Sequence, residues 1–191
     1  LIVPADTCWL DAPGPVGPSP NTARHAVDDD RIEDLAAVLR SDEPAAILVG
    51  GTAMRAGALY DAARIGAATG AKVLSETFPT RAERGAGTPA VDRLAYLAEF
   101  AQMRLDGLRH LVVVDAAHPV SFFAYPDKAS DLVPDGCQVH VLASPEEDAA
   151  LALASLVEAL DAPGDVDTIA AVRPDRPTGA LNAETMAAAL G

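Results

Sequence analysis

Four short apolar runs, separated by segments long enough to form helices, constrain the fold of this chain more than any other feature. They cover residues 45–49, 71–74, 110–115 and 138–143. The run at 45–49 is apolar at every position and ends at two glycines, which is typical of a strand buried on both faces. Strands that alternate with helices need crossover connections and therefore lie parallel in one sheet. The pattern predicts a doubly wound, mostly parallel α/β sheet.

The segments between these runs carry helical patterns. The aspartates at 28–30 suit the start of a first helix, because carboxylates cap helix N-termini and complement the helix dipole. Gly70 is typical of the residue that ends a helix in the left-handed conformation. Ser144 followed by Pro145 predicts an N-cap and a first helical turn. The helices expected after the first span about 54–68, 91–105, 144–160 and 183–190.

Composition and charge exclude several classes of function. The chain has 191 residues, half of them apolar and few aromatic, which favours one layered α/β domain with tails over a β-sandwich. The net charge of −14 repels phosphate backbones and anionic lipid, so we expect neither a nucleic-acid nor a membrane partner. No signal peptide opens the chain and no run is long enough to span a membrane. We therefore expect a cytoplasmic protein.

Proline-rich and glycine-rich segments set the expected domain boundaries. Residues 11–24 predict an extended surface segment, and the folded unit is expected at 25–160. Residues 161–180 are again rich in proline, glycine and aspartate, so 161–191 is expected to be a linker and a short helix. The chain starts at Leu1 and its residues 1–3 have the composition of a strand. We expect a piece of a longer polypeptide.

The strand tips hold the candidate site residues, since ligands of such sheets bind beyond the carboxyl ends of the strands. The glycine pair at the first tip either lets a nucleotide approach the backbone or only permits a tight turn. An acidic residue at a tip either binds a ribose hydroxyl or caps the next segment. The histidine at the third tip is either a ligand or a solvated loop residue. The candidates are Gly50, Gly51, Thr52, Glu76, Asp115 and His118.

Motifs of catalysis and metal binding are missing. The glycine-rich stretch reads GGTAMRAG, which matches neither dinucleotide nor phosphate-loop fingerprint. No GxSxG elbow or HExxH spacing occurs. The two cysteines, Cys8 and Cys137, lack the CxxC spacing of a zinc or redox site. The sequence therefore predicts a binding crevice without catalytic residues or a metal site.

Residues 25–160 resemble the central, Rossmann-like domain of thiamine diphosphate (ThDP)-dependent enzymes, above all acetolactate synthase large subunits and acetolactate synthase-like proteins. The segments that carry the resemblance begin at DDRIEDLAAVLRSDEPAAILVGGTAMRAG and continue at HPVSFFAYPDKASDLVPDGCQVHVLA. The flank LIVPADTCW, within residues 1–24, resembles the end of a pyrimidine-binding domain. The flank TGALNAETMAAAL resembles the start of a pyrophosphate-binding domain.

The resemblance implies a larger parent enzyme. Such enzymes bind ThDP and Mg²⁺ with their two outer domains, act on 2-oxo acids and work as homodimers or homotetramers. Neither the activating glutamate nor the GDG…N motif is present here, so the fragment is expected to bind no ThDP and to be non-catalytic. Some central domains of the family hold FAD or ADP. Here DAAHPVSFF replaces the RFDDR-like segment of FAD-binding members, which favours an empty pocket.

Two other hypotheses stay open from the residues alone. The first is a free-standing Rossmann-type nucleotide-binding module, which the glycine pair and Asp115 favour. The second is an interaction scaffold in which the alanine-rich helix at 149–159 packs between subunits instead of only covering the sheet.

Overall fold

The computed structural model describes residues 4–11, 14–20, 22–124, 126–173 and 175–190. Within these ranges, five strands form one sheet in the order β3-β2-β1-β4-β5, and every pairing is parallel. The doubly wound α/β class is thereby confirmed. The strand expected at residues 1–3 lies outside the described residues. The strands are β1 (Ala45–Val49), β2 (Lys72–Ser75), β3 (Asp92–Arg93), β4 (His110–Val114) and β5 (Gln138–Ala143).

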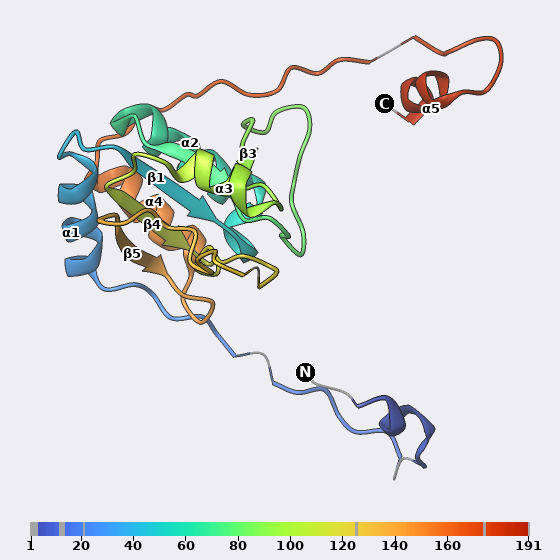
Figure 1. The fold of residues 1–191 in the computed structure, drawn as a ribbon, viewed down its shortest axis with the longest axis horizontal. Coiled ribbons are helices and arrows are strands. Elements are labelled where there is room, and N and C mark those ends of the chain that lie inside the picture. Colours follow the sequence, from blue (N-terminus) through green and yellow to red (C-terminus); the bar gives the residue numbers. More distant parts are fainter. Residues whose placement is uncertain (1–3, 12–13, 21, 125, 174, 191) are drawn as a thin grey trace.

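Helices cover both faces of this sheet unequally (Figure 1). On one face, α1 (Asp29–Leu39), α2 (Ala56–Thr69) and α4 (Ala149–Ala159) enclose the larger core. On the other face, α3 (Ala98–Leu105) and the loop before β5 enclose a smaller one. The alanine-rich α4 thus covers the sheet with its buried side chains. The left-handed Gly70, with a φ of 73°, ends α2 as the sequence predicts.

The helix expected at 91–105 is wrong in its first half. Residues 92 and 93 form the edge strand β3, which pairs with β2 from Leu74 and Ser75. The Leu94 N–H then donates to the Ser75 carbonyl at 2.8 Å. Pairing with the sheet already buries Leu94, so its apolar side chain does not belong to a helical stripe. The helix begins only at Ala98.

The cap expected at Ser144 is also wrong. The helix α4 starts at Ala149, and the Asp148 side chain accepts from the Leu151 N–H at 3.0 Å. Glu147 instead folds back and accepts from the Ser144 N–H at 2.8 Å. This turn lies beside His25, whose N–H donates to the Glu146 carbonyl, so a contact distant in sequence displaces the helix start.

The two ends of the chain lie apart from the layered body (Figure 1). The 3-10 helix η1 (Ala5–Trp9) and the helix α5 (Ala183–Leu190) bury no residue. The segment between α4 and α5 nevertheless packs on the domain as far as Ile169, which exchanges backbone hydrogen bonds with Gly87 and Thr88 at 2.9 Å each. None of the described helices is long and apolar enough to cross a membrane.

Candidate functional site

The carboxyl ends of β1 and β4 lie side by side, at the point where the strand order reverses. Chain connections leave this point in opposite directions, which is where doubly wound sheets open a crevice for ligands. The structure brings four of the predicted site residues together here, from the 3-10 helix η2 (Gly51–Met54) and its preceding glycine, and from the residue that follows β4. They are Gly50, Gly51, Thr52 and Asp115.

Asp115 is the centre of this cluster. Its Oδ2 accepts from the Thr52 N–H and from the Thr52 hydroxyl, both at 2.7 Å. The same oxygen forms an ion pair with Arg24 at 2.8 Å. Burial is the largest single influence and would raise the pKa of Asp115, but the hydrogen bonds from Arg24 and Thr52 together outweigh it, so the pKa lies below its usual value. Arg24, which the sequence analysis assigned to the preceding tail, is a site residue that the analysis missed.

Protein atoms explain why glycine stands at positions 50 and 51. A Cβ at Gly50 would lie 2.7 Å from the Asp115 carbonyl oxygen and from Glu76 Oε1. A Cβ at Gly51 would lie 2.4 Å from Asp115 Oδ2, and its φ of +43° also favours glycine. The two carboxylates thus occupy the space that the missing side chains leave. These contacts account for both glycines without a ligand.

The N-terminus of α2, a natural anion site, also has a partner from the chain itself. Glu83 Oε2 accepts from the Ala56 N–H at 2.9 Å, and the Glu83 N–H donates to the Met54 carbonyl. Arg55 lies 3.9 Å from the same carboxylate. Because a carboxylate at a helix N-terminus satisfies the free N–H groups and the dipole, Glu83 fills the place that a phosphate would take.

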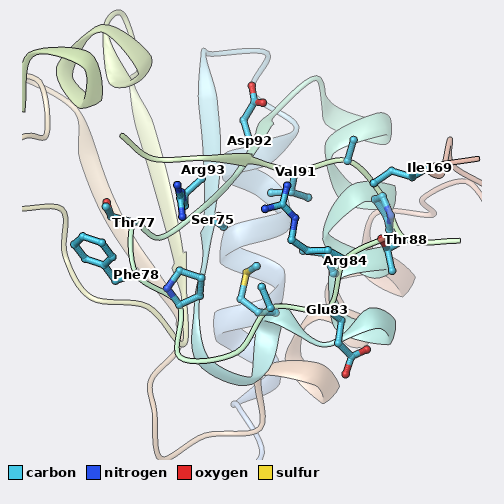
Figure 2. Close-up of a pocket in the computed structure, with 16 residues that line it drawn as sticks. Ser75, Thr77, Phe78, Glu83, Arg84, Thr88, Val91, Asp92, Arg93 and Ile169 are labelled. Atoms are coloured by element: carbon cyan, nitrogen blue, oxygen red, sulfur yellow. The ribbon is translucent and has the colours of Figure 1, made fainter. Parts of the chain in front are cut away.

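A cavity of about 640 Å³ opens next to this filled crevice, beyond the ends of β2 and β3 (Figure 2). Its walls are the loop after β2, the edge strand β3 and the segment at Ile169. Ser75 and Thr77, both largely buried, also line it. Its size lies in the range of pockets for organic ligands.

Four charged residues line this pocket. The carboxylates of Glu83 and Asp92 have partners, the Ala56 N–H and Arg104, whereas the two arginines have none among the described residues. Figure 2 shows Arg84 entering from the loop after β2 and Arg93 from β3. In the part of the chain that the structure describes, neither guanidinium has an ion pair or a side-chain hydrogen bond. In a chain with a net charge of −14, two unpaired cations in one cavity favour an anionic ligand. In the sequence, only the run RAER at 81–84, which contains Arg84, points to a basic site at this loop. Arg93 could not be found in this way, because its position depends on β3.

Glu76 also joins the cluster at the strand tips, since its Oε1 accepts from the Gly51 N–H at 3.3 Å, and together with His118 it lines a second and smaller cavity. His118 Nε2 lies 2.9 Å from Asp131 Oδ1 across the loop between β4 and β5. Hydrogen bonds from the backbone of Val133 and from His118 lower the pKa of Asp131. His118 thus has a partner, Asp131, on its own loop.

The described residues hold no group of three or more metal-binding side chains. Both cysteines are free thiols. The described residues therefore offer no cluster of carboxylates that would hold Mg²⁺ beside the diphosphate of ThDP.

No protein-family model matches the chain. A search of curated proteins finds the "Putative acetolactate synthase large subunit IlvX" of Mycobacterium tuberculosis, 54% identical over 192 residues. The match covers 100% of this chain and 36% of that protein. The chain thus spans about a third of the length of this relative.

Solved structures share the fold at low sequence identity. A putative thiamin diphosphate-dependent enzyme from Mycobacterium smegmatis matches with a TM-score of 0.54 and 22% identity, over 87% of this chain and 34% of that one. Benzoylformate decarboxylase from Polynucleobacter necessarius matches with a TM-score of 0.54 and 19% identity, over 92% and 36%. Together with the curated relative, these matches confirm the resemblance to a domain of ThDP-dependent enzymes.

Proposed function

We propose that this chain, a domain of the ThDP-enzyme kind, is the central structural domain of an acetolactate synthase-like enzyme that acts on 2-oxo acids. The observation that carries the proposal is the 54% identity along the whole chain to one third of such a protein. ThDP and Mg²⁺ would be bound by the other parts of the parent, which we expect to be a cytoplasmic homodimer or homotetramer.

The decisive experiment uses the longer gene product that contains this sequence. We expect it to release ThDP on denaturation and to consume a 2-oxo acid such as pyruvate, whereas the 191-residue chain alone does neither. Light scattering of the longer product measures its oligomeric state. A gene product of this length only, without ThDP, would contradict the proposal and favour a free-standing nucleotide-binding module.

The larger cavity favours a second function for the same domain, the binding of a nucleotide such as ADP or FAD. In the filled crevice, Asp115 binds the Thr52 N–H and Glu83 binds the Ala56 N–H, so neither of these donors is free for a phosphate. The neighbouring cavity offers the unpaired Arg84 and Arg93 instead. These guanidinium groups would hold the phosphates, and the Ser75 and Thr77 hydroxyls would donate to their oxygens.

Calorimetric titration with ADP tests this nucleotide site. We expect ADP to bind and Arg84→Gln or Arg93→Gln to weaken it by about tenfold or more, since a hydrogen bond to a charged group contributes about 1.5–3 kcal/mol. Arg81→Gln is the matched control, because Arg81 lies in the same loop but does not line the cavity. If the three variants lose affinity equally, only the general charge matters and the site is not there.

A further inference from the structure

The second cavity, of about 220 Å³, lies at the ends of β1, β2 and β4 on the α3 face of the sheet. We name it the Glu76 pocket. Its walls are mostly apolar and include Leu48, Leu94 and Leu132, all of which belong to the smaller core. Glu76 and His118 are its titratable residues. An apolar surface with one carboxylate is the usual composition of a small-molecule site.

Glu76 carries a negative charge that nothing in the described part of the chain neutralises. Its Oε1 accepts from the Gly51 N–H at 3.3 Å, and the Ala117 N–H also donates to its carboxylate. No cationic side chain forms an ion pair with it within the described ranges, whereas Asp115 beside it has Arg24. Two N–H donors leave lone pairs of the carboxylate free for a further partner.

The environment makes that charge costly. Burial raises the pKa of Glu76 above its usual value, and the nearby Asp115 carboxylate adds to the shift, against the two backbone hydrogen bonds. A carboxylate that is partly removed from water is stabilised when a cation pairs with it. Among the described residues, the ion-pair partner of His118 is Asp131, 2.9 Å from its Nε2, and not Glu76.

Aromatic rings stand at the mouth of the pocket. Phe78 and Phe122 line it and contact each other edge to face, with ring centroids 4.9 Å apart. Tyr96 packs against both, and Phe123 packs against Tyr96. Between 43% and 60% of each of these four residues is exposed. Ring faces attract cations electrostatically, and a carboxylate beside them adds to the attraction.

We propose that the Glu76 pocket binds a small organic ammonium ion, with the cationic group at the Glu76 carboxylate and an apolar body against the Phe78 and Phe122 rings and the leucine walls. The pocket is smaller than the roughly 300–1,000 Å³ that drug-sized ligands need. A protonated amine on one ring or a short aliphatic group therefore matches its size. This site adjoins the arginine-lined cavity, with which it shares Thr77 and Phe78, but it presents a carboxylate where that cavity presents arginines. It does not depend on the proposed parent enzyme.

The test uses three probes of similar shape and different charge: benzylammonium, benzyl alcohol and benzoate. Amide chemical shifts of the isotope-labelled 191-residue chain are followed during titration. We expect saturable shifts at Gly51 and Ala117 with benzylammonium, and an affinity about tenfold or more above that for benzyl alcohol. Benzoate is expected not to bind here. Equal affinity for the ammonium and the alcohol overturns the proposal, as does the lack of a saturable shift.

Matched variants separate the charge from the rings. Glu76→Gln keeps the shape and is expected to reduce benzylammonium affinity about tenfold, whereas Glu33→Gln, on the outer surface of α1, leaves it unchanged. Phe122→Ala is expected to reduce it severalfold, and Phe100→Ala, an exposed phenylalanine outside the pocket, is the control. Because Phe122 is half exposed, its variant folds even if Glu76→Gln does not. An unchanged affinity in folded Glu76→Gln or in Phe122→Ala places the cation elsewhere.

Discussion

Replacing Gly51 with alanine tests how tightly the β1 and β4 tips are packed. The new Cβ would lie 2.4 Å from Asp115 Oδ2 and 2.5 Å from its Cγ, well inside contact distance. The Asp115 side chain cannot simply move away, because it is almost completely buried and holds Thr52 and Arg24. The alanine would also have to adopt the left-handed φ of +43°.

The magnitude follows from these two effects. A left-handed conformation costs an alanine about 1–2 kcal/mol, and the loss of one hydrogen bond to a charged group costs about 1.5–3 kcal/mol. The free energy of unfolding of Gly51→Ala should therefore fall by about 2.5–5 kcal/mol. In a chain of this length that lowers Tm by about 5–20 °C, at about 2–4 °C per kcal/mol.

Urea unfolding followed by circular dichroism measures this change, and Gly57→Ala is the matched control. Gly57 lies in α2, and no heavy atom stands within 4 Å of the place that a Cβ would take there. Alanine at this position should therefore stabilise the chain by about 0.5–1 kcal/mol. If the free energy of unfolding of Gly51→Ala differs from that of the unchanged chain by less than about 0.5 kcal/mol, which is the effect of an ordinary surface substitution, the packing argument is refuted.

Three further changes test the tips and the sheet. Arg24→Gln should bring the pKa of Asp115 back toward its usual value. The lowered pKa stabilises the folded chain at pH values above the usual pKa of an aspartate, and this stabilisation is lost as pH falls. The midpoint of acid unfolding should therefore move to higher pH in the variant. Gly66→Ala should lower the free energy of unfolding, measured with urea, by about 1–3 kcal/mol, although alanine usually stabilises a helix. The new Cβ would lie 2.9 Å from the Ala71 carbonyl oxygen and 2.9 Å from Val73 Cγ2. Burial, and to a lesser extent the neighbouring His110, lowers the pKa of His140, so the free energy of unfolding should fall as pH drops below 6.5. In His140→Gln, the urea midpoint should depend less on pH over this range.

Several elements could be predicted from local pattern alone. Strands β1 and β5 and helix α5 occupy the residues expected for them, and Gly70 ends α2 in the expected conformation. Each of these depends on neighbours in sequence: an apolar run, a run of helix-forming residues, or a glycine free of Cβ strain. The parallel arrangement also followed, because strands joined through helices have few other options.

The candidate site was predictable only in part, because its partners come from distant segments. The strand tips were found at Gly50, Glu76 and Asp115, but nothing local indicates that Arg24 reaches Asp115 across 91 positions. The pocket with Arg84 and Arg93 depends on β3, which the helical spacing concealed.

The sequence by itself determined the family resemblance and the order along the chain of the α-helices and of every strand except β3, since these depend on short stretches and on residue identity. Only the tertiary structure decided which charges are neutralised and which stay free. Asp115 and Glu76 both follow buried strands, yet one meets an arginine and the other faces an apolar pocket. The reason is physical: the energy of a charge depends on what surrounds it in space, and folding brings those groups together from far apart in the chain.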